Sequence, residues 1–318
     1  MSTFAPRALL VFDSGTEELV DALVSNQLGC AVSTLPSDEL SAQTDTQIAS
    51  AEHLVVCGDI KLIKQVMLVA AERDVSLGIL PTNEQDRLRR YMGLPESRNA
   101  AIEWALRRDC KASDLVLCNG EVLLFRAVIG WLPMLDSSED LDGMSILKRL
   151  FTRSTRLRLY PYQLLTANER KVDTAATGCM IIQRHEGDLV SRLLGKQLSV
   201  RDGKVGVLVS SPFSMMEYMK FLYQLVSLRK SSGLPNAVGY LESGSFEIDS
   251  DKVKDVYIDG ELTTQTPVKV ETRPAALRLN YGPSLLEQEP VSEPDKEVIR
   301  VDNLRSEKEL ARSIGSRV

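Results

Sequence analysis

The sequence contains few of the residues that build disulfide frameworks or metal centres. Its 318 residues include five cysteines and two histidines. The cysteines are scattered, odd in number and form no Cys-x-x-Cys pair, which argues against a disulfide framework or a structural zinc site and favours a reducing compartment. A histidine-rich metal site is excluded because only His53 and His185 are present. We expect His53 to be structural and His185 to be solvated.

Long uncharged apolar runs are also missing. The strongest candidate, residues 123–135, contains Arg126 and Pro133 and does not reach the length needed to cross a bilayer. The first residues lead directly into a predicted strand and lack the apolar core of a signal peptide. A net charge of −6 argues against nucleic acid as the main partner. These absences predict a cytoplasmic protein that is not an integral membrane protein.

The first third of the chain alternates between patterns typical of strands and helices. Short apolar runs predict strands at 8–12, 30–35, 53–57 and 76–80. Helical patterns follow these strands, at 19–24, 62–69, 84–92 and 97–108. Repeated strand–helix units predict a doubly wound parallel sheet, whose ligands bind beyond the carboxyl ends of the strands.

The pattern changes near residue 114. The pair Asn119-Gly120 between two apolar runs predicts a hairpin with a type I′ turn. Later extended runs, at 253–258, 267–271 and 275–279, favour an antiparallel β-sandwich, interrupted by one predicted helix at 215–228. We therefore divide the chain into an α/β nucleotide-binding-like domain (1–118), a β-rich lipid- or substrate-like domain (119–283) and a tail (284–318).

The tail combines an acidic segment with a short helical pattern. Residues 287–297 are charged and proline-containing, which predicts an extended linker. Asn303 is a favoured N-cap for a final helix carrying Leu304, Ala311 and Ile314 on one side. So short a helix is marginal alone. We expect the tail to contact a partner protein and its removal to leave the stability of the chain unchanged.

Several motifs, in order, resemble those of the bacterial diacylglycerol kinase and lipid kinase family, relatives of the sphingosine and NAD kinases. Cys57-Gly58-Asp59-Ile60-Lys61 stands where that family has Gly-Gly-Asp-Gly-Thr. The stretch from Ile79 to Arg89, followed by Gly93-Leu94-Pro95, is similar to its I-x-P-x-G-T-x-N-D-F-A phrase and the G-[LI]-P after it. Four further motifs match between residues 7 and 283: Asp114 to Gly130, Asp202-Gly203, Asp259-Gly260-Glu261, and Pro274 to Leu279.

The resemblance implies a nucleotide site formed by Asp13, Gly58, Asp59, Asn83, Glu84 and Asp114. Several residues in these loops depart from the family pattern. Cys57 and Ile60 replace glycines that let backbone N–H groups approach a phosphate, and Ile60 is branched where a positive φ is often required. Glu84 would face the phosphates, and two like charges about 4 Å apart cost about 4 kcal/mol at an effective dielectric near 20. The sequence therefore predicts weak or lost ATP binding.

In the second domain the resemblance implies a catalytic carboxylate and a metal ligand. Asp259 would act as general base on a lipid hydroxyl, with Glu261 beside it. Asp202 would help to hold Mg²⁺, although Ser199 stands where an acidic companion is usual. The alternative is that Asp259-Gly260-Glu261 serves only as a turn between strands.

A basic stretch suggests a membrane contact. Residues 143–160 contain no acids and five basic residues: Lys148, Arg149, Arg153, Arg156 and Arg158. Basic and apolar groups on one helix suit an anionic membrane surface, which would place the protein at the inner membrane face. The alternative is a solvated helix that packs on one side.

Three functions follow from these observations. The first is a lipid-kinase-like protein with lost or weak phosphotransfer, which acts as a lipid-binding or regulatory module without a cofactor. The second is an active lipid kinase that uses Mg²⁺ and ATP to phosphorylate a diacylglycerol-like hydroxyl. The third is a non-catalytic subunit of a larger assembly.

Overall fold

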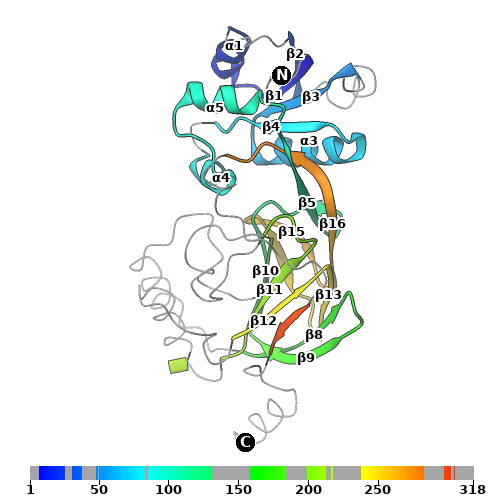
Figure 1. Cartoon of the computed structure of the whole chain (residues 1–318). Helices are drawn as coiled ribbons and strands as arrows, with labels where there is room; N and C mark the ends of the chain where they lie inside the picture. Colours follow the sequence, from blue (N-terminus) through cyan, green and yellow to red (C-terminus); the bar gives the residue numbers. More distant parts are fainter. Residues whose placement is uncertain are drawn as a thin grey trace, which may run out of the picture. The chain divides into compact units, whose positions relative to one another are not determined.

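The computed structural model describes residues 7–25, 31–37, 48, 50–82, 85–130, 158–183, 199–212, 216–217, 238–282, 297–301 and 304 (Figure 1). The chain forms two compact units, Met1–Leu115 with Pro274–Glu289, and Val116–Arg273 with Pro290–Val318. The predicted fold class, a doubly wound α/β domain followed by an antiparallel β-sandwich, is confirmed. The division differs from the predicted one because Pro274–Glu289 returns to the first unit.

The first unit contains a parallel sheet with the strand order β2-β1-β3-β4-β16. Its strands are β1 (Arg7–Phe12), β2 (Ala31–Pro36), β3 (His53–Cys57), β4 (Ser76–Ile79) and the end of β16 (Val268–Leu279). Arg278 and Leu279 of β16 pair in parallel with Ser76 and Leu77. A segment about 200 residues further along the chain thus completes the sheet next to β4.

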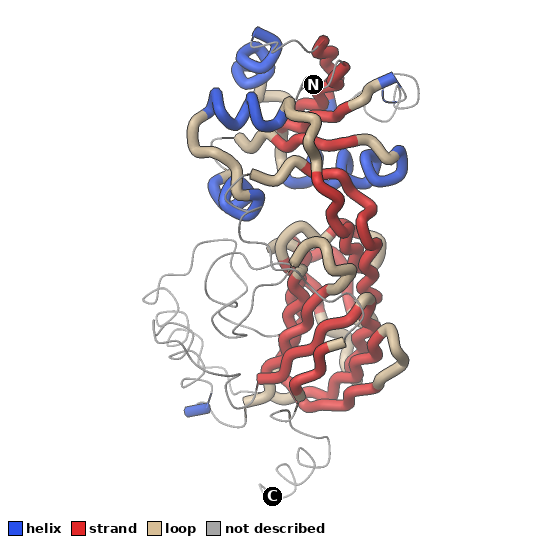
Figure 2. The backbone as a smooth tube through the Cα atoms, viewed as in Figure 1, coloured by secondary structure: helices blue, strands red, loops and turns tan. Residues whose placement is uncertain are grey.

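Helices cover the sheet of the first unit (Figure 2). They are α1 (Glu17–Ser25), α3 (Ile60–Arg73), α4 (Asp86–Met92) and α5 (Arg98–Ala105). α1 and α5 share a core cluster with alternate strand residues such as Leu10 and Val55. Leu9 and Leu54, which point to the other face, are also buried. Burial on both faces explains why these strands are continuous hydrophobic runs.

His53 is a buried link between β3, β4 and α5, as predicted for a structural histidine. Its Nε2 donates to the carbonyl oxygen of Ala105 at 2.7 Å, and its Nδ1 lies 2.8 Å from the hydroxyl of Ser76. A carbonyl oxygen can only accept, so Nε2 carries the proton of the neutral ring. Burial lowers the pKa of His53 below its usual value, although the bond to Ala105 opposes this.

The lowered pKa of His53 predicts a pH-dependent stability. Below about pH 6.5 the unfolded chain binds a proton at this ring that the folded chain resists, so the free energy of unfolding should fall by up to about 1.4 kcal/mol per pH unit. Above that pH the contribution is constant. In denaturant unfolding between pH 5 and 7, the free energy of unfolding of His53→Gln should depend less on pH than that of the wild-type chain. His185→Gln serves as the control. An identical slope in His53→Gln would contradict this assignment.

The second unit is an antiparallel β-sandwich, and Figure 1 labels several of its strands, among them β8, β10 and β13. One sheet has the order β15-β14-β7-β10-β11-β12-β17, and the other contains β16-β13-β8-β9. The remaining bounds are β5 (Lys111–Cys118), β6 (Glu121–Val122), β7 (Arg126–Gly130), β8 (Tyr160–Thr166), β9 (Lys171–Ala176), β10 (Gly178–Ile182), β11 (Val205–Ser210), β12 (Val238–Ser243), β13 (Ser245–Ser250), β14 (Asp255–Ile258), β15 (Glu261–Gln265) and β17 (Val298–Arg300).

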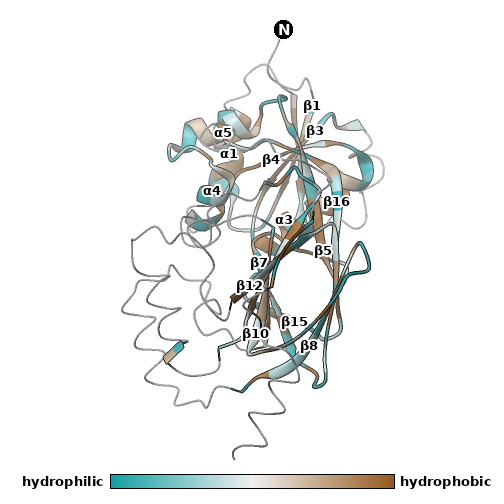
Figure 3. Cartoon of the chain, turned by 60° about the horizontal axis from the view of Figure 1, so that its bottom comes forward, coloured by the Kyte–Doolittle hydropathy of each residue, from teal (hydrophilic) through white to brown (hydrophobic). Residues whose placement is uncertain are grey.

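The two sheets bury one core cluster between them, with residues such as Ile129, Ile181 and Val207 from the first sheet and Leu164 and Phe246 from the second. The hydrophobic colouring of β7, β10 and β12 in Figure 3 agrees with this burial. No helix among the described residues is long and apolar enough to cross a membrane.

Two tight turns in this unit have the geometry that the sequence suggested. Asn119 and Gly120 have φ values of 49° and 86° between the paired residues Cys118 and Glu121. Asp259 and Gly260 have φ values of 54° and 97° between Ile258 and Glu261. Positive φ at both central residues is the type I′ geometry, so the predicted hairpin at Asn119-Gly120 is confirmed.

Part of the tail belongs to the β-sandwich rather than to a separate linker and helix. β17 pairs with β12, and Ile299, Val301 and Leu304 pack against the core cluster. A Cβ at Gly239 would lie 2.5 Å from Cγ of Leu304, so the two residues are in close contact. Residues 305–318 and most of the predicted helix at 215–228 lie outside the described residues. Because this part of the tail packs in the β-sandwich, we expect its removal to lower the stability of the chain.

Candidate functional site

The candidate nucleotide site lies at the carboxyl ends of β1 and β3, where Asp13 and Gly58 meet. The backbone N–H of Asp13 donates to the carbonyl oxygen of Cys57 at 3.1 Å. A Cβ added to Gly58 would lie 2.6 Å from Cδ2 of Leu62 and 3.0 Å from Cβ of Asp13. Gly58 is thus required by close packing against two side chains of the chain itself.

Asp59 is the N-cap of α3. Its Oδ1 accepts a hydrogen bond from the backbone N–H of Leu62 at 2.7 Å. Ile60 is the first residue of the helix and is not among the described residues with positive φ, so the expected strain at this branched side chain is wrong. The positive end of the helix, where a phosphate would bind, already holds a carboxylate.

Gln85 joins the loop after β3 to the loop after β4, a role that we did not predict. Its Nε2 donates to the carbonyl oxygen of Gly58 at 2.8 Å, and its Oε1 accepts from the backbone N–H of Thr82 at 3.0 Å. The sequence did contain a signal. Gln85 has a long amide side chain and directly follows Asn83-Glu84, which replace the family's Gly-Thr pair. Asn83 and Glu84 lie outside the described residues.

The carboxylate of Asp13 is also engaged locally. Its Oδ1 accepts from the backbone N–H of Ser14 at 2.9 Å and from the hydroxyl of Ser37 at 3.1 Å. The structure therefore brings Asp13, Gly58 and Asp59 together at one edge of the sheet, as the resemblance implied. The N–H of Asp13 bonds to the end of β3, the carbonyl oxygen of Gly58 accepts from Gln85, and Asp59 bonds within its own helix.

Asp114 has a structural position. It is 3% exposed, and its Oδ1 accepts from the backbone N–H of Ala275 at 2.9 Å. Ala275 has a φ of 53°, which is uncommon for a residue other than glycine. Asp114 therefore stabilises an irregular point in β16.

Asp259 anchors the segment between β6 and β7. Its Oδ1 accepts from the backbone N–H groups of Phe125 at 2.7 Å and Arg126 at 2.9 Å, and its Oδ2 accepts from Leu124 at 3.0 Å. Its own N–H donates to the carbonyl oxygen of Arg126 at 2.8 Å. Glu261 is exposed on β15. This arrangement supports the structural alternative for Asp259-Gly260-Glu261.

Asp202 lies in the predicted turn before β11. Its Oδ1 accepts from the backbone N–H of Lys204 at 3.1 Å, and Gly203 has a φ of 68°. Ser199 is buried, and its hydroxyl accepts from the N–H of Arg201. Among the described residues no three His, Cys, Asp or Glu side chains gather closely enough to hold a metal ion. Magnesium binding by Asp202 stays a prediction.

The predicted membrane contact falls largely outside the described part of the chain. Lys148, Arg149, Arg153 and Arg156 are not described, and Arg158 is exposed just before β8. The membrane contact therefore also stays a prediction.

With this geometry established, solved structures identify the fold. A diacylglycerol kinase from Bacillus anthracis superposes with a TM-score of 0.63 at 15% identity, covering 89% of this chain and 99% of that one. A protein provisionally assigned as a diacylglycerol kinase from the same organism gives 0.66 at 16% identity, covering 89% of this chain and all of that one. No protein-family model and no curated protein sequence matches this chain. The chain has the diacylglycerol kinase fold.

Proposed function

We propose that this chain is a lipid-kinase-like protein that has lost efficient ATP-dependent phosphotransfer and acts as a lipid-binding or regulatory module. The fold supports the relation to lipid kinases. The observation that carries the loss of phosphotransfer is the closure of the phosphate loops by the chain's own side chains. Gln85 bonds to the carbonyl oxygen of Gly58 and to the backbone N–H of Thr82.

A triphosphate needs backbone N–H groups that are free to bind it. Here the N–H of Thr82 donates to Gln85. A nucleotide would have to replace this bond, which is worth about 0.5–1.5 kcal/mol. It would also meet the carboxylate of Asp13, which would repel its phosphates.

The state of Asp259 in the second unit supports the same proposal. A general base needs an oxygen that can accept a proton from the substrate. Both carboxylate oxygens of Asp259 already accept backbone hydrogen bonds, and two of these are shorter than 3.0 Å. Protonation would remove the negative charge that strengthens these three hydrogen bonds, so it would weaken the anchor.

The proposal predicts that Mg²⁺ and ATP leave the unfolding temperature unchanged. A ligand present at about a hundredfold excess over its Kd stabilises the folded state by about 2.7 kcal/mol, which a thermal scan would detect. The scan is paired with an assay for γ-phosphate transfer to diacylglycerol in mixed micelles. Native mass spectrometry of the same samples should retain lipid but no nucleotide. An upward shift of several degrees together with phosphorylated lipid would establish the active kinase instead.

The variant Gln85→Ala removes the hydrogen bonds that join the two loops and does not change the charge of the chain. If the amide bridge is what excludes nucleotide, this variant should show a larger ATP-dependent shift than the wild-type chain. Gln65→Ala, the same change at an exposed position of α3 outside the loop motif, is the matched control.

A further inference from the structure

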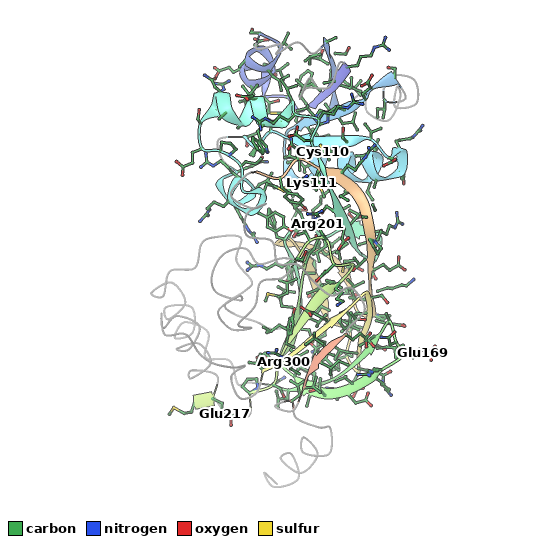
Figure 4. All side chains as sticks on the ribbon, viewed as in Figure 1. Cys110, Lys111, Glu169, Arg201, Glu217 and Arg300 are labelled. Atoms are coloured by element: carbon green, nitrogen blue, oxygen red, sulfur yellow. The ribbon has the colours of Figure 1, made fainter. Side chains whose placement is uncertain are left out.

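A polar pocket opens at the opposite end of the parallel sheet, at the amino ends of β3 and β4. Its volume is about 280 Å³. It is lined by Ala51, Glu52, Asp74, Val75, Ser76, Arg108, Cys110 and Arg278. All of these belong to the first unit, and Figure 4 labels Cys110 and the neighbouring Lys111 where the chain enters β5. The pocket is separate in the sheet from the loops that contain Gly58 and Gln85.

Two guanidinium groups and two carboxylates line this pocket, and they form one close ion pair and one loose ion pair. Arg278 makes two contacts with Asp74: its Nε lies 3.2 Å from Oδ1, and its Nη2 donates to the carbonyl oxygen. Arg108 makes one loose contact, with 3.7 Å between its Nη1 and Oε2 of Glu52. The side chains of this second pair are 58% and 41% exposed. Such exposed pairs contribute little to stability, so a ligand that separates the two side chains loses little by doing so.

The rest of the lining is uncharged. Burial raises the pKa of Cys110 to about 12, so the thiol is protonated at neutral pH. The hydroxyl oxygen of Ser76 lies 3.1 Å from the carbonyl oxygen of Glu52 and 2.8 Å from Nδ1 of His53. Positive and negative groups are therefore balanced in the pocket. A simple anion would be attracted by Arg108 but repelled by Glu52 at nearly the same distance.

We propose that this pocket binds a small zwitterion of the amino-acid type. Arg108 binds the carboxylate of the ligand, because a planar guanidinium matches a carboxylate in two parallel hydrogen bonds. Glu52, 3.7 Å away in the unliganded pair, accepts the ammonium group. The short distance between the two partners selects a ligand whose opposite charges are two or three bonds apart. The remaining volume accommodates a polar side chain next to Ser76 and Cys110.

The test is calorimetric titration of the full chain with L-glutamine, compared with two analogues that each lack one charge. 4-Carbamoylbutyrate lacks the ammonium group, and 4-aminobutyramide lacks the carboxylate. We expect saturable binding of L-glutamine and at least tenfold weaker binding of both analogues. Absence of saturable binding, or equal binding of 4-carbamoylbutyrate, would overturn the proposal, the latter by showing an anion site without selection for the ammonium group.

Variants locate the binding. Arg108→Gln and Glu52→Gln should each weaken L-glutamine at least tenfold, whereas Lys111→Gln, an exposed neighbour outside the pocket lining, should leave it unchanged. Because Arg108 and Glu52 are half-exposed, thermal scans should show that the variants fold. Arg108→Lys keeps the charge but loses the paired donors, so it should bind between Arg108→Gln and the wild type. Undiminished binding in Arg108→Gln would place the ligand elsewhere. None of these results depends on nucleotide binding.

Discussion

Replacing Asp259 by alanine is expected to lower the stability of the chain strongly. The change removes both acceptor oxygens from the N–H groups of Leu124, Phe125 and Arg126, in a partly buried turn. Hydrogen bonds to a charged group are worth about 1.5–3 kcal/mol each, and water replaces part of them, so we expect a loss of about 3 kcal/mol. In a unit of this size the loss corresponds to about 6–12 °C in Tm. Thermal unfolding followed by circular dichroism measures it.

Two further variants distinguish an anchoring role from a catalytic one. Glu261→Ala changes an exposed carboxylate in the same hairpin and should leave Tm unchanged. Asp259→Asn keeps the shape but turns an NH₂ group toward a backbone N–H, so its Tm should lie between those of Asp259→Ala and the wild type. If Asp259→Ala kept its Tm while a lipid phosphorylation activity disappeared, Asp259 would be the general base and the proposed loss of catalysis would be wrong.

Local signals in the sequence were sufficient for the strands and helices of the first unit and for one tight turn. Apolar runs at 53–57 and 76–80 correspond to β3 and β4, because strands buried on both faces need hydrophobic residues throughout. The pair Asn119-Gly120 predicted its turn because few other residues adopt positive φ at two successive positions. Each of these signals acts over a few neighbouring residues.

Pairing between distant segments could not be predicted in the same way. The run at 275–279 was expected to be a strand, but the sequence does not indicate that Arg278 pairs with Ser76 in the first unit. Likewise, β17 follows an acidic segment and was not predicted, since a strand of three residues is too short to show a periodic pattern. Strand partners are selected by tertiary packing, which local propensity does not encode.

In the candidate site, too, the sequence predicted which residues gather but not which contacts they make. The resemblance located Asp13, Gly58 and Asp59 at one edge of the sheet, where the structure has them. It could not show that Asp59 caps its own helix or that Gln85 bridges to Gly58. Whether a loop binds a ligand or its own side chains depends on such contacts, which the residue types alone do not specify.

Removing residues 297–318 is expected to destabilise the β-sandwich, in contrast to the expectation from the sequence alone. The deletion takes away β17, which pairs with residues Tyr240, Leu241 and Glu242 of β12. It also exposes the side chains that Ile299, Val301 and Leu304 cover in the core cluster. Partial burial of three aliphatic side chains stabilises the folded state by about 3–4 kcal/mol. The entropy lost when the segment becomes ordered reduces this to a net value of about 2 kcal/mol. We therefore expect a decrease of about 4–8 °C in Tm.

A second contribution to the stability of the β-sandwich comes from Glu297, whose side chain forms hydrogen bonds with residues outside the tail. Its Oε1 accepts from the hydroxyl of Ser243 at 2.7 Å and from the N–H of Asn168 at 3.3 Å. Burial acts to raise the pKa of Glu297, but these hydrogen bonds outweigh it and lower the pKa. The charged form is therefore the one that the folded state prefers at neutral pH, so Glu297→Gln should reproduce a small part of the effect of the deletion.

The matched control for the deletion ends the chain after residue 305, which keeps β17 and Leu304. If the strand is what stabilises the β-sandwich, this shorter deletion should leave Tm close to that of the full chain, while the deletion from residue 297 lowers it. Thermal scans of the three proteins at one concentration make the comparison. Equal Tm values for all three would mean that the pairing of β17 with β12 contributes nothing, and the tail would again be available for a partner protein, as its acidic composition first suggested.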